Sequence, residues 1–236
     1  MMFMLSISAT TQAASYGPYI ESGTVVSWNV EEVTNFTLWY TGGGYCVALN
    51  GSSIEFYTTS VEDDVVGTLS IGNVSVATND TMIALDLTLG VWPTWLPGLF
   101  VEVGQNNIEN LNESAYAAAE RIEGNWMNGT ITSRYENISI GVTIQECIVF
   151  DYQQDSPGTQ VTHLAYSLSS GVLVEADTSV TFGSTYKLVI SLSSLEYPTI
   201  VDLTAPPGTG IILLGIVGGG LLAVIVIAFI KLSRRN

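Results

Sequence analysis

Seven asparagines stand in the acceptor sequence for N-linked glycans, Asn-X-Ser or Asn-X-Thr. The chemistry that they offer is attachment of a sugar to the side-chain amide, on the surface of an exported chain. Their number is about twice what chance allows for this content of serine and threonine. We predict that most of these sites carry glycans: Asn35, Asn50, Asn73, Asn79, Asn112, Asn128 and Asn137.

The other ionisable side chains are weaker candidates for chemistry. Glu62-Asp63-Asp64 and the pair Asp151/Asp155 could supply calcium ligands or be solvated acidic loops, and neither has the spaced ligands of an EF-hand. His163, the single histidine, has no neighbouring cysteine and is expected at the surface. The sequence contains no GxSxG, HExxH, P-loop or GxGxxG motif. We therefore expect a protein that is not an enzyme, with no catalytic, cofactor-binding or metal-binding residues.

The two cysteines, Cys46 and Cys147, are about a hundred residues apart. Neither belongs to a CxxC motif or a Cys/His cluster, which disfavours a metal site. Outside the cell such a pair forms a disulfide, and closing a loop of this length adds on the order of 4 to 5 kcal/mol in the entropic model. We predict that the two are bridged.

Acidic side chains outnumber basic ones by 22 to 6. Three of the bases, Lys231, Arg234 and Arg235, lie at the C-terminus, whereas every carboxylate precedes residue 210. This balance excludes nucleic acid as a partner, because phosphates require a basic surface. It also disfavours docking on an anionic lipid surface. The carboxylates either keep a surface domain soluble or face cations outside the cell.

Alternation of apolar and polar residues predicts β-strands over much of the chain. The sequence Asn50-Gly51 predicts a hairpin between strands near 45–49 and 54–56, and a change of parity at Gly72-Asn73 predicts a bulge. The alternating runs are 26–30, 36–40, 83–89, 138–150, 164–168 and 188–192.

One helix is predicted among these strands, near residues 111–123, with Asn110 as its cap and Gly124 at its end. Its apolar face would hold Leu111, Ala115, Ala118 and Ile122. A single helix among strands predicts a mainly β fold: a curved antiparallel sheet, half-barrel or sandwich-like, with one packed helix. This domain would span residues 14–204.

The segment Trp92-Pro93-Thr94-Trp95-Leu96-Pro97 is apolar, and its two prolines exclude it from a central strand. Two interpretations remain open. The segment caps the open end of the core, or Trp92 and Trp95 form the lip of a ligand cavity.

The C-terminal region predicts a membrane anchor. Residues 210–230 carry no charge and, at ~1.5 Å per residue, would cover about 31 Å, the thickness of a hydrocarbon core. The basic tail 231–236 then places the C-terminus in the cytoplasm and the domain outside a plasma membrane. Residues 1–13 resemble a signal peptide, and the Pro- and Gly-rich residues 205–209 form a short linker.

Small residues recur every fourth position in this apolar segment, at Gly215, Gly219 and Ala223. Such a ridge lets two membrane helices approach closely. A homodimer through the membrane helix is one expectation, although glycine is common in spanning helices in any case.

Three parts of the chain together resemble the archaeal surface-anchored "choice-of-anchor" ectodomains: WPTWLP, the hairpin HLAYSLSSGVLVEAD, and the Gly-rich anchor with its KLSRRN end. The hairpin is similar to the YDxxTGxL pattern of that family, with Ser167 in place of the acid and Ser170 in place of the threonine. The resemblance implies a curved antiparallel sheet with a helix on its concave side. It implies no particular activity.

The expected function is therefore a non-enzymatic binding or envelope role at the cell surface, with an extracellular partner still to be named. One alternative is a carrier or sensor that holds an apolar ligand between sheet and helix. Another is a viral envelope glycoprotein.

Overall fold

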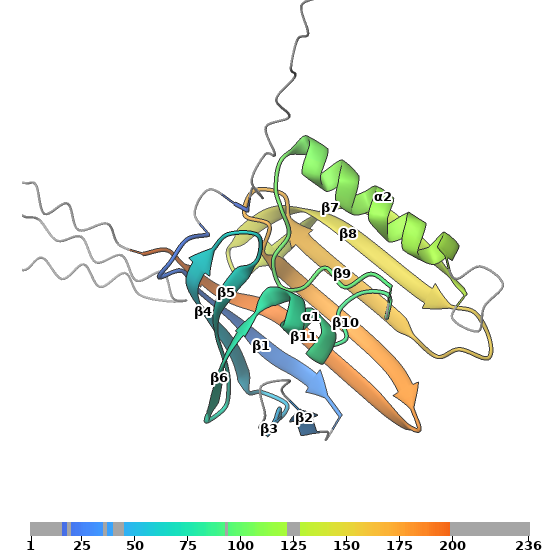
Figure 1. The fold of residues 1–236 in the computed structure, drawn as a ribbon, viewed down its shortest axis with the longest axis horizontal. Helices are drawn as coiled ribbons and strands as arrows, with labels where there is room; N and C mark the ends of the chain where they lie inside the picture. The colour runs from blue at the N-terminus through green and yellow to red at the C-terminus, as the bar shows by residue number, and fades with distance from the viewer. Residues whose placement is uncertain are drawn as a thin grey trace, which may run out of the picture.

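The computed structural model describes residues 16–17, 20–34, 37–39, 45–92, 94–121 and 128–198. Nine strands form one antiparallel sheet that is not closed, in the order β6-β5-β4-β1-β11-β10-β9-β8-β7 (Figure 1). These strands are β1 (Val25–Val33), β4 (Ser53–Val61), β5 (Val65–Ile71), β6 (Val74–Asn79), β7 (Gly129–Ile140), β8 (Thr143–Gln154), β9 (Val161–Ser167), β10 (Leu173–Phe182) and β11 (Ser184–Glu196). The mainly β fold is confirmed.

A separate two-stranded sheet contains β2 (Thr37–Trp39) and β3 (Tyr45–Val47). The two helices are α1 (Asp80–Asp86) and α2 (Gln105–Arg121). The prediction of a hairpin around Asn50-Gly51 is wrong, because β3 pairs with β2, and β4 pairs with β1 and β5. The turn instead packs on the end of β1, where the Asn50 side-chain oxygen accepts a hydrogen bond from the Val33 N–H at 2.7 Å.

Short turns account for most of the strand order. β4, β5 and β6 follow one another on one side of β1, and β11 to β7 follow in reverse on the other. The predicted bulge at Gly72-Asn73 is in fact a two-residue turn, since Ile71 pairs directly with Val74. Gly72 has a φ of +59°, which a glycine adopts without the steric cost of a side chain.

The run 83–89, predicted as a strand, is the main correction. It begins as helix α1 and continues as irregular chain. Ile83 and Leu87 are fully buried, whereas Leu85 is 42% exposed. A strand would have placed all three on one face, while a helix places only positions four apart together. Asn79 starts the helix, and its side-chain oxygen accepts from the Met82 N–H at 2.9 Å.

The helix predicted near residues 111–123 is confirmed as α2, although it begins earlier, at Gln105. α2 begins after Gly104, which has a φ of +99°, so Asn110 lies inside the helix and is not its cap. Ala115 and Ala118 are buried, as the pattern predicts. The expected end near Gly124 lies outside the described residues. Within the described part of the chain, two helices rather than one accompany the sheet.

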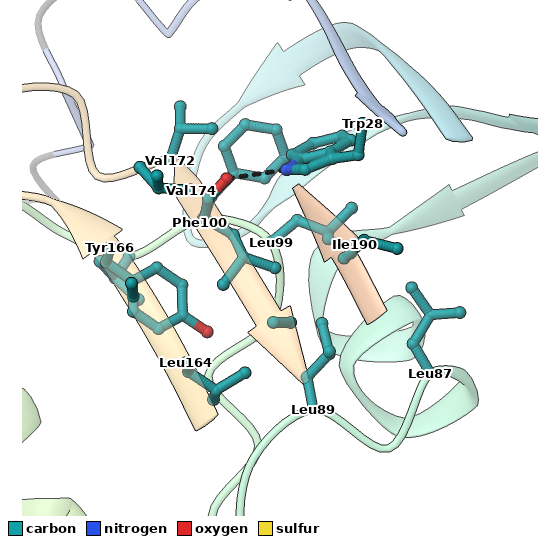
Figure 2. Close-up of a cluster of buried hydrophobic side chains, with 14 of the residues drawn as sticks. Trp28, Leu87, Leu89, Leu99, Phe100, Leu164, Tyr166, Val172, Val174 and Ile190 are labelled. Carbon is teal, nitrogen blue, oxygen red and sulfur yellow. Dashed lines mark hydrogen bonds between the residues drawn. The ribbon is translucent and has the colours of Figure 1, made fainter. Parts of the chain in front are cut away.

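The core lies between one face of the sheet and a cover made of α1, α2 and residues 87–101, which we call the strap (Figures 1 and 2). Trp28 on β1 is fully buried, and its indole N–H donates to the Leu173 carbonyl at 2.7 Å. Its ring meets Phe100 of the strap edge-on, with centroids 6.3 Å apart. Sheet and strap therefore share one core.

The strap is irregular and buried, so its peptide groups need partners that water cannot supply. Side chains of the sheet, and Gln160 just before β9, donate to its carbonyls: Tyr186 to Leu87 at 2.8 Å, Thr178 to Thr88 at 3.2 Å, Gln160 to Gly90 at 2.8 Å and Tyr166 to Gly98 at 2.8 Å. The strap also makes backbone hydrogen bonds near the start of β10. The Leu173 N–H donates to the Leu99 carbonyl at 2.8 Å, and the Val101 N–H donates to the carbonyl of Gly171, two residues before β10, at 2.8 Å. These contacts hold a loop in the place of a second sheet.

Among the residues that the structure describes, no helix is long and apolar enough to cross a membrane. Residues 1–13, 205–209, 210–230 and 231–236 all lie outside the described part. The leader, the linker, the membrane helix with its Gly215, Gly219 and Ala223 ridge, and the basic tail stay predictions.

Candidate ligand groove beside helix α2

A groove of about 440 Å³ runs between the first half of α2 and the end of the strap. Tyr16, from the segment that precedes β1, forms part of its wall. The complete lining is Tyr16, Pro97, Phe100, Val101, Glu102, Asn107, Asn110, Leu111 and Ser114. The groove therefore joins three parts of the chain that are far apart in sequence.

The floor of the groove is apolar and rigid. Phe100 and Val101 are only 2% and 4% exposed. Phe100 packs on Phe56 with ring centroids 5.4 Å apart. It also forms an antiparallel β-bridge with Val172, the residue just before β10. A floor held by such contacts offers a ligand a preformed apolar surface.

Asp80 of α1 fixes the backbone behind this floor. Its two carboxylate oxygens accept hydrogen bonds from the N–H groups of Leu99 at 2.7 Å and Phe100 at 3.1 Å. A Cβ on Gly98 would lie 2.1 Å from Asp80 Oδ2, so only glycine allows this close approach. Burial raises the pKa of the Asp80 carboxyl well above its usual value, and the two hydrogen bonds act in the opposite direction.

The rim of the groove is polar. Glu102 stands on the strap side, and Asn107, Asn110 and Ser114 stand on the helix side. Two of these groups are engaged locally: the Asn107 amide donates to the Val103 carbonyl at 2.8 Å, and the Ser114 hydroxyl donates to the Leu111 carbonyl at 2.8 Å. The rim thus presents oxygen atoms above an apolar floor.

The electrostatic field at the groove is negative. The pKa of the Tyr16 hydroxyl is raised well above its usual value, first by burial and then by the charges of Asp80, Asp64, Glu102 and Asp63. None of the groove-lining residues is basic. The groove therefore disfavours anions and favours groups that carry positive charge or donate hydrogen bonds.

Trp92 and Trp95, one interpretation of which was the lip of a ligand cavity, do not line this groove. Trp95 is buried and packs edge-on against Phe150, with ring centroids 5.0 Å apart. The backbone N–H of Trp92 donates to the side-chain oxygen of Gln160 at 3.3 Å. Neither residue lines the groove beside α2. The arrangement of Trp95 agrees with the alternative interpretation, in which the segment covers the core.

Asp151 and Asp155, which the sequence offered as possible calcium ligands, have other partners. Asp151 lies on the face of the sheet opposite to Phe150 and contacts His163 Nδ1 at 2.7 Å and the Arg134 guanidinium. Desolvation raises the pKa of Asp151, but the hydrogen bonds from His163 and Arg134 lower it by more, so the net direction is down. Asp155 accepts from the Asn128 amide at 2.7 Å. Among the described residues, no group of three or more metal-ligating side chains forms.

The side chain of Cys147 is buried on β8. Burial, followed by the charges of Glu175, Glu136 and Glu146, raises its pKa to about 12. Such a thiol is a poor nucleophile at neutral pH. The side chain of Cys46 lies outside the described residues, so its pairing with Cys147 stays a prediction.

The glycan acceptors differ in their surroundings. Asn50, Asn73 and Asn137 are exposed, the last as its strand pattern predicts. Asn112 is half-buried on α2, and its side-chain oxygen is buried without a hydrogen-bond partner among the described residues. Asn128 is half-buried, and Asn35 lies outside the described part. Glycan occupancy remains a prediction.

Asn79 combines an acceptor sequence with a structural role, and this provides a test of the N-cap. Replacing Asn79 by alanine should lower the free energy of unfolding by about 1 kcal/mol, because the Met82 N–H loses its acceptor. Thr81→Ala destroys the same acceptor sequence but keeps the cap, so its stability should be unchanged. Urea denaturation of unglycosylated material measures both. Equal loss in the two variants would contradict the cap assignment.

No protein-family model matches the chain, and comparison with curated proteins finds no match. The groove residues therefore come from geometry alone. Sequence reasoning missed Tyr16, Phe100 and Glu102, because none belongs to a motif and they meet only when the strap folds over the sheet. The apolar run at residues 99–101 was the one sequence signal for the floor of the groove.

Proposed function

We propose that the protein is a single-pass cell-surface protein whose external domain binds a small amphiphilic cation and does not catalyse a reaction. The observation that carries the proposal is the groove beside α2, with a buried apolar floor at Phe100 and Val101 below a rim of side-chain oxygens. The floor would accept the apolar body of the ligand. The rim would accept its hydrogen bonds.

The sign of the ligand charge follows from the surroundings of Tyr16. Besides the buried Asp80, whose own pKa is raised, the carboxylates Asp64, Glu102 and Asp63 act on its hydroxyl, and Glu102 lines the groove. A cation would gain from this field, whereas a carboxylate of the same size would be repelled. The proposed ligand is therefore a primary or quaternary amine attached to an alkyl or aryl group.

The surface location is supported by the sequence. Residues 210–230 are long and apolar enough to span a bilayer, and Lys231, Arg234 and Arg235 follow immediately. The resemblance to anchored ectodomains with a curved sheet and a helix on the concave side points the same way. Protease added to intact cells should remove the external domain and spare the basic tail. Extraction of the chain by alkaline carbonate would contradict this part of the proposal.

Three probes with the same eight-carbon body test the binding site: octylammonium, octanol and octanoate. Titration calorimetry of the folded domain should give affinity in that order, since only the charged group differs. Glu102→Gln should weaken octylammonium binding about threefold to tenfold and leave octanol unchanged, because one facing charge is removed.

Two further variants complete this test. Glu113→Gln removes a charge from the exposed face of α2, where it does not line the groove, and should change no affinity. Ser114→Trp should block all three probes by filling the groove. Equal affinity for octylammonium and octanoate, or binding that survives Ser114→Trp, would exclude the groove as the site.

A further inference from the structure

The most exposed large apolar side chains of the described part gather on the β7–β8 hairpin. Val142 is 103% exposed, Ile144 70% and Tyr135 63%, and the next residue in rank, Leu49 elsewhere in the fold, is 55% exposed. Single exposed apolar residues are ordinary, but three at the top of the ranking on one hairpin mark an interaction surface.

The end of this hairpin is narrow and uncharged. Its strands are joined by the two-residue turn Gly141-Val142, and Ile140 pairs with Thr143. The last three pairs, 138–140 with 143–145, contain isoleucine, serine, threonine and glutamine only. The nearest ionisable side chain is Glu146, which pairs with Asn137. Residues 138–145, which we call the tip, therefore carry no charge in a strongly acidic protein.

The strand register places the tip at the same end of the sheet as the end of β11. Glu196, the last residue of β11, pairs with Val25 at the start of β1. On the other side of β11, the start of β10 pairs with the end of β9. Ser167, the last residue of β9, pairs with Cys147, which lies four residues after the start of β8 at the β7–β8 turn. Figure 1 shows the β7–β8 turn and the end of β11 on the same side of the molecule.

The chain that leaves this end leads to the apolar run 210–230. Twelve residues, 198–209, lie between Tyr197 and Gly210, a reach of at most about 45 Å when fully extended. Pro206-Pro207 makes part of this connection stiff. If residues 210–230 span the bilayer, the sheet end that carries the tip is the end that faces the bilayer.

We propose that the tip inserts Val142 and Ile144 into the outer leaflet of the membrane that anchors the chain. This proposal rests on the proposed surface location and adds a second lipid contact to it. The partner is a zwitterionic lipid surface, because the acidic domain disfavours anionic headgroups. Insertion of a few apolar residues to a depth of about 5–10 Å is typical of interfacial contacts. A glycan on Asn137 would stand between the tip and the bilayer, so the proposal requires that this site be unmodified.

The experiment uses the full chain reconstituted in phosphatidylcholine vesicles. In a Cys46→Ser background, a cysteine is introduced by Val142→Cys and labelled with an environment-sensitive fluorophore. Cys147 stays unlabelled because it is buried and its thiol has a pKa of about 12. The matched control is Ser184→Cys, at the exposed first residue of β11, next to the β10–β11 turn at the opposite end of the sheet.

We expect emission at shorter wavelength for the label at position 142, and quenching by nitroxide-labelled phosphatidylcholine. The label at 184 should report water. Equal aqueous spectra at both positions, in a chain that resists carbonate extraction, would overturn the tip proposal and leave the proposed function intact. A shift at position 142 that occurs in native membranes but not in pure lipid would overturn it in favour of a protein partner. A chain that carbonate extracts would defeat both proposals.

Discussion

Replacing Asp80 by alanine is expected to lower the free energy of unfolding by about 2–6 kcal/mol. The substitution removes both acceptors from the N–H groups of Leu99 and Phe100, which lie in a buried part of the strap where water cannot replace them. Each unpaired buried donor costs about 1–3 kcal/mol. Chemical denaturation of wild type and variant at neutral pH measures the difference.

The same residue gives a pH signature. Because burial raises the pKa of Asp80 in the folded protein, the folded state binds a proton more tightly than the unfolded state does. The contribution of this group to stability is then greatest below the usual pKa of 3.8 and falls as the pH rises through the folded-state value. The stability difference between wild type and Asp80→Ala should therefore be larger near pH 4 than near pH 8.

Asp63→Ala is the matched control for Asp80→Ala. Asp63 is an exposed carboxylate of the neighbouring acidic loop, and its removal should change stability by less than about 0.5 kcal/mol. A loss in Asp80→Ala no larger than that of the control would show that the strap does not depend on this carboxylate. A stability difference that grows with pH would contradict the direction of the pKa shift.

Replacing Trp28 by alanine is expected to cost about 3–5 kcal/mol, as large-to-small substitutions in a core do. Trp28 is fully buried at the centre of the sheet, where it touches Phe100 and donates to the Leu173 carbonyl. The cavity would lie between β1 and the strap, so the floor of the groove should loosen as well. Thermal unfolding measures the first effect, and hydrogen exchange at Phe100 measures the second.

Trp28→Phe separates packing from the hydrogen bond. Phenylalanine keeps most of the apolar contact but leaves the Leu173 carbonyl without its donor, so about 1–3 kcal/mol of the loss should remain. Tyr57→Ala, on the neighbouring strand β4 and 46% exposed, is the control and should have a small effect. A Trp28→Phe variant as stable as wild type would mean that the indole hydrogen bond contributes nothing.

The run 138–150, predicted as one alternating strand, is in fact a hairpin, since β7 ends at Ile140 and β8 begins at Thr143. Residues 147–150 of β8 are all buried, so alternation does not continue there. The strand at 188–192 was predicted correctly, because Leu188, Ile190 and Leu192 are buried and the two residues between them are half-buried. The prediction for α2 succeeded for a similar reason, since Ala115 and Ala118 both fall on its buried face. Its start was misplaced because Gly104, not a capping side chain, ends the preceding segment.

The run 83–89 could not be read correctly from local pattern. Four apolar residues at alternate positions favour a strand, but capping by Asn79 and burial of Ile83 with Leu87 favour a helical turn. What decides between them is the space on the sheet that α1 and the strap fill. That space is created by Trp28, Tyr166 and other residues far away in the sequence.

By itself, the sequence determined the strand-rich class, the acidic surface and the apolar C-terminal run, because composition and periodicity express solvent preference directly. Only the tertiary structure decided how Asp80 meets Leu99, how Tyr16 and Glu102 come to share a groove, and which end of the sheet carries the exposed tip. The physical reason is that each of these depends on contacts between distant segments, and a local pattern records burial without recording the partner.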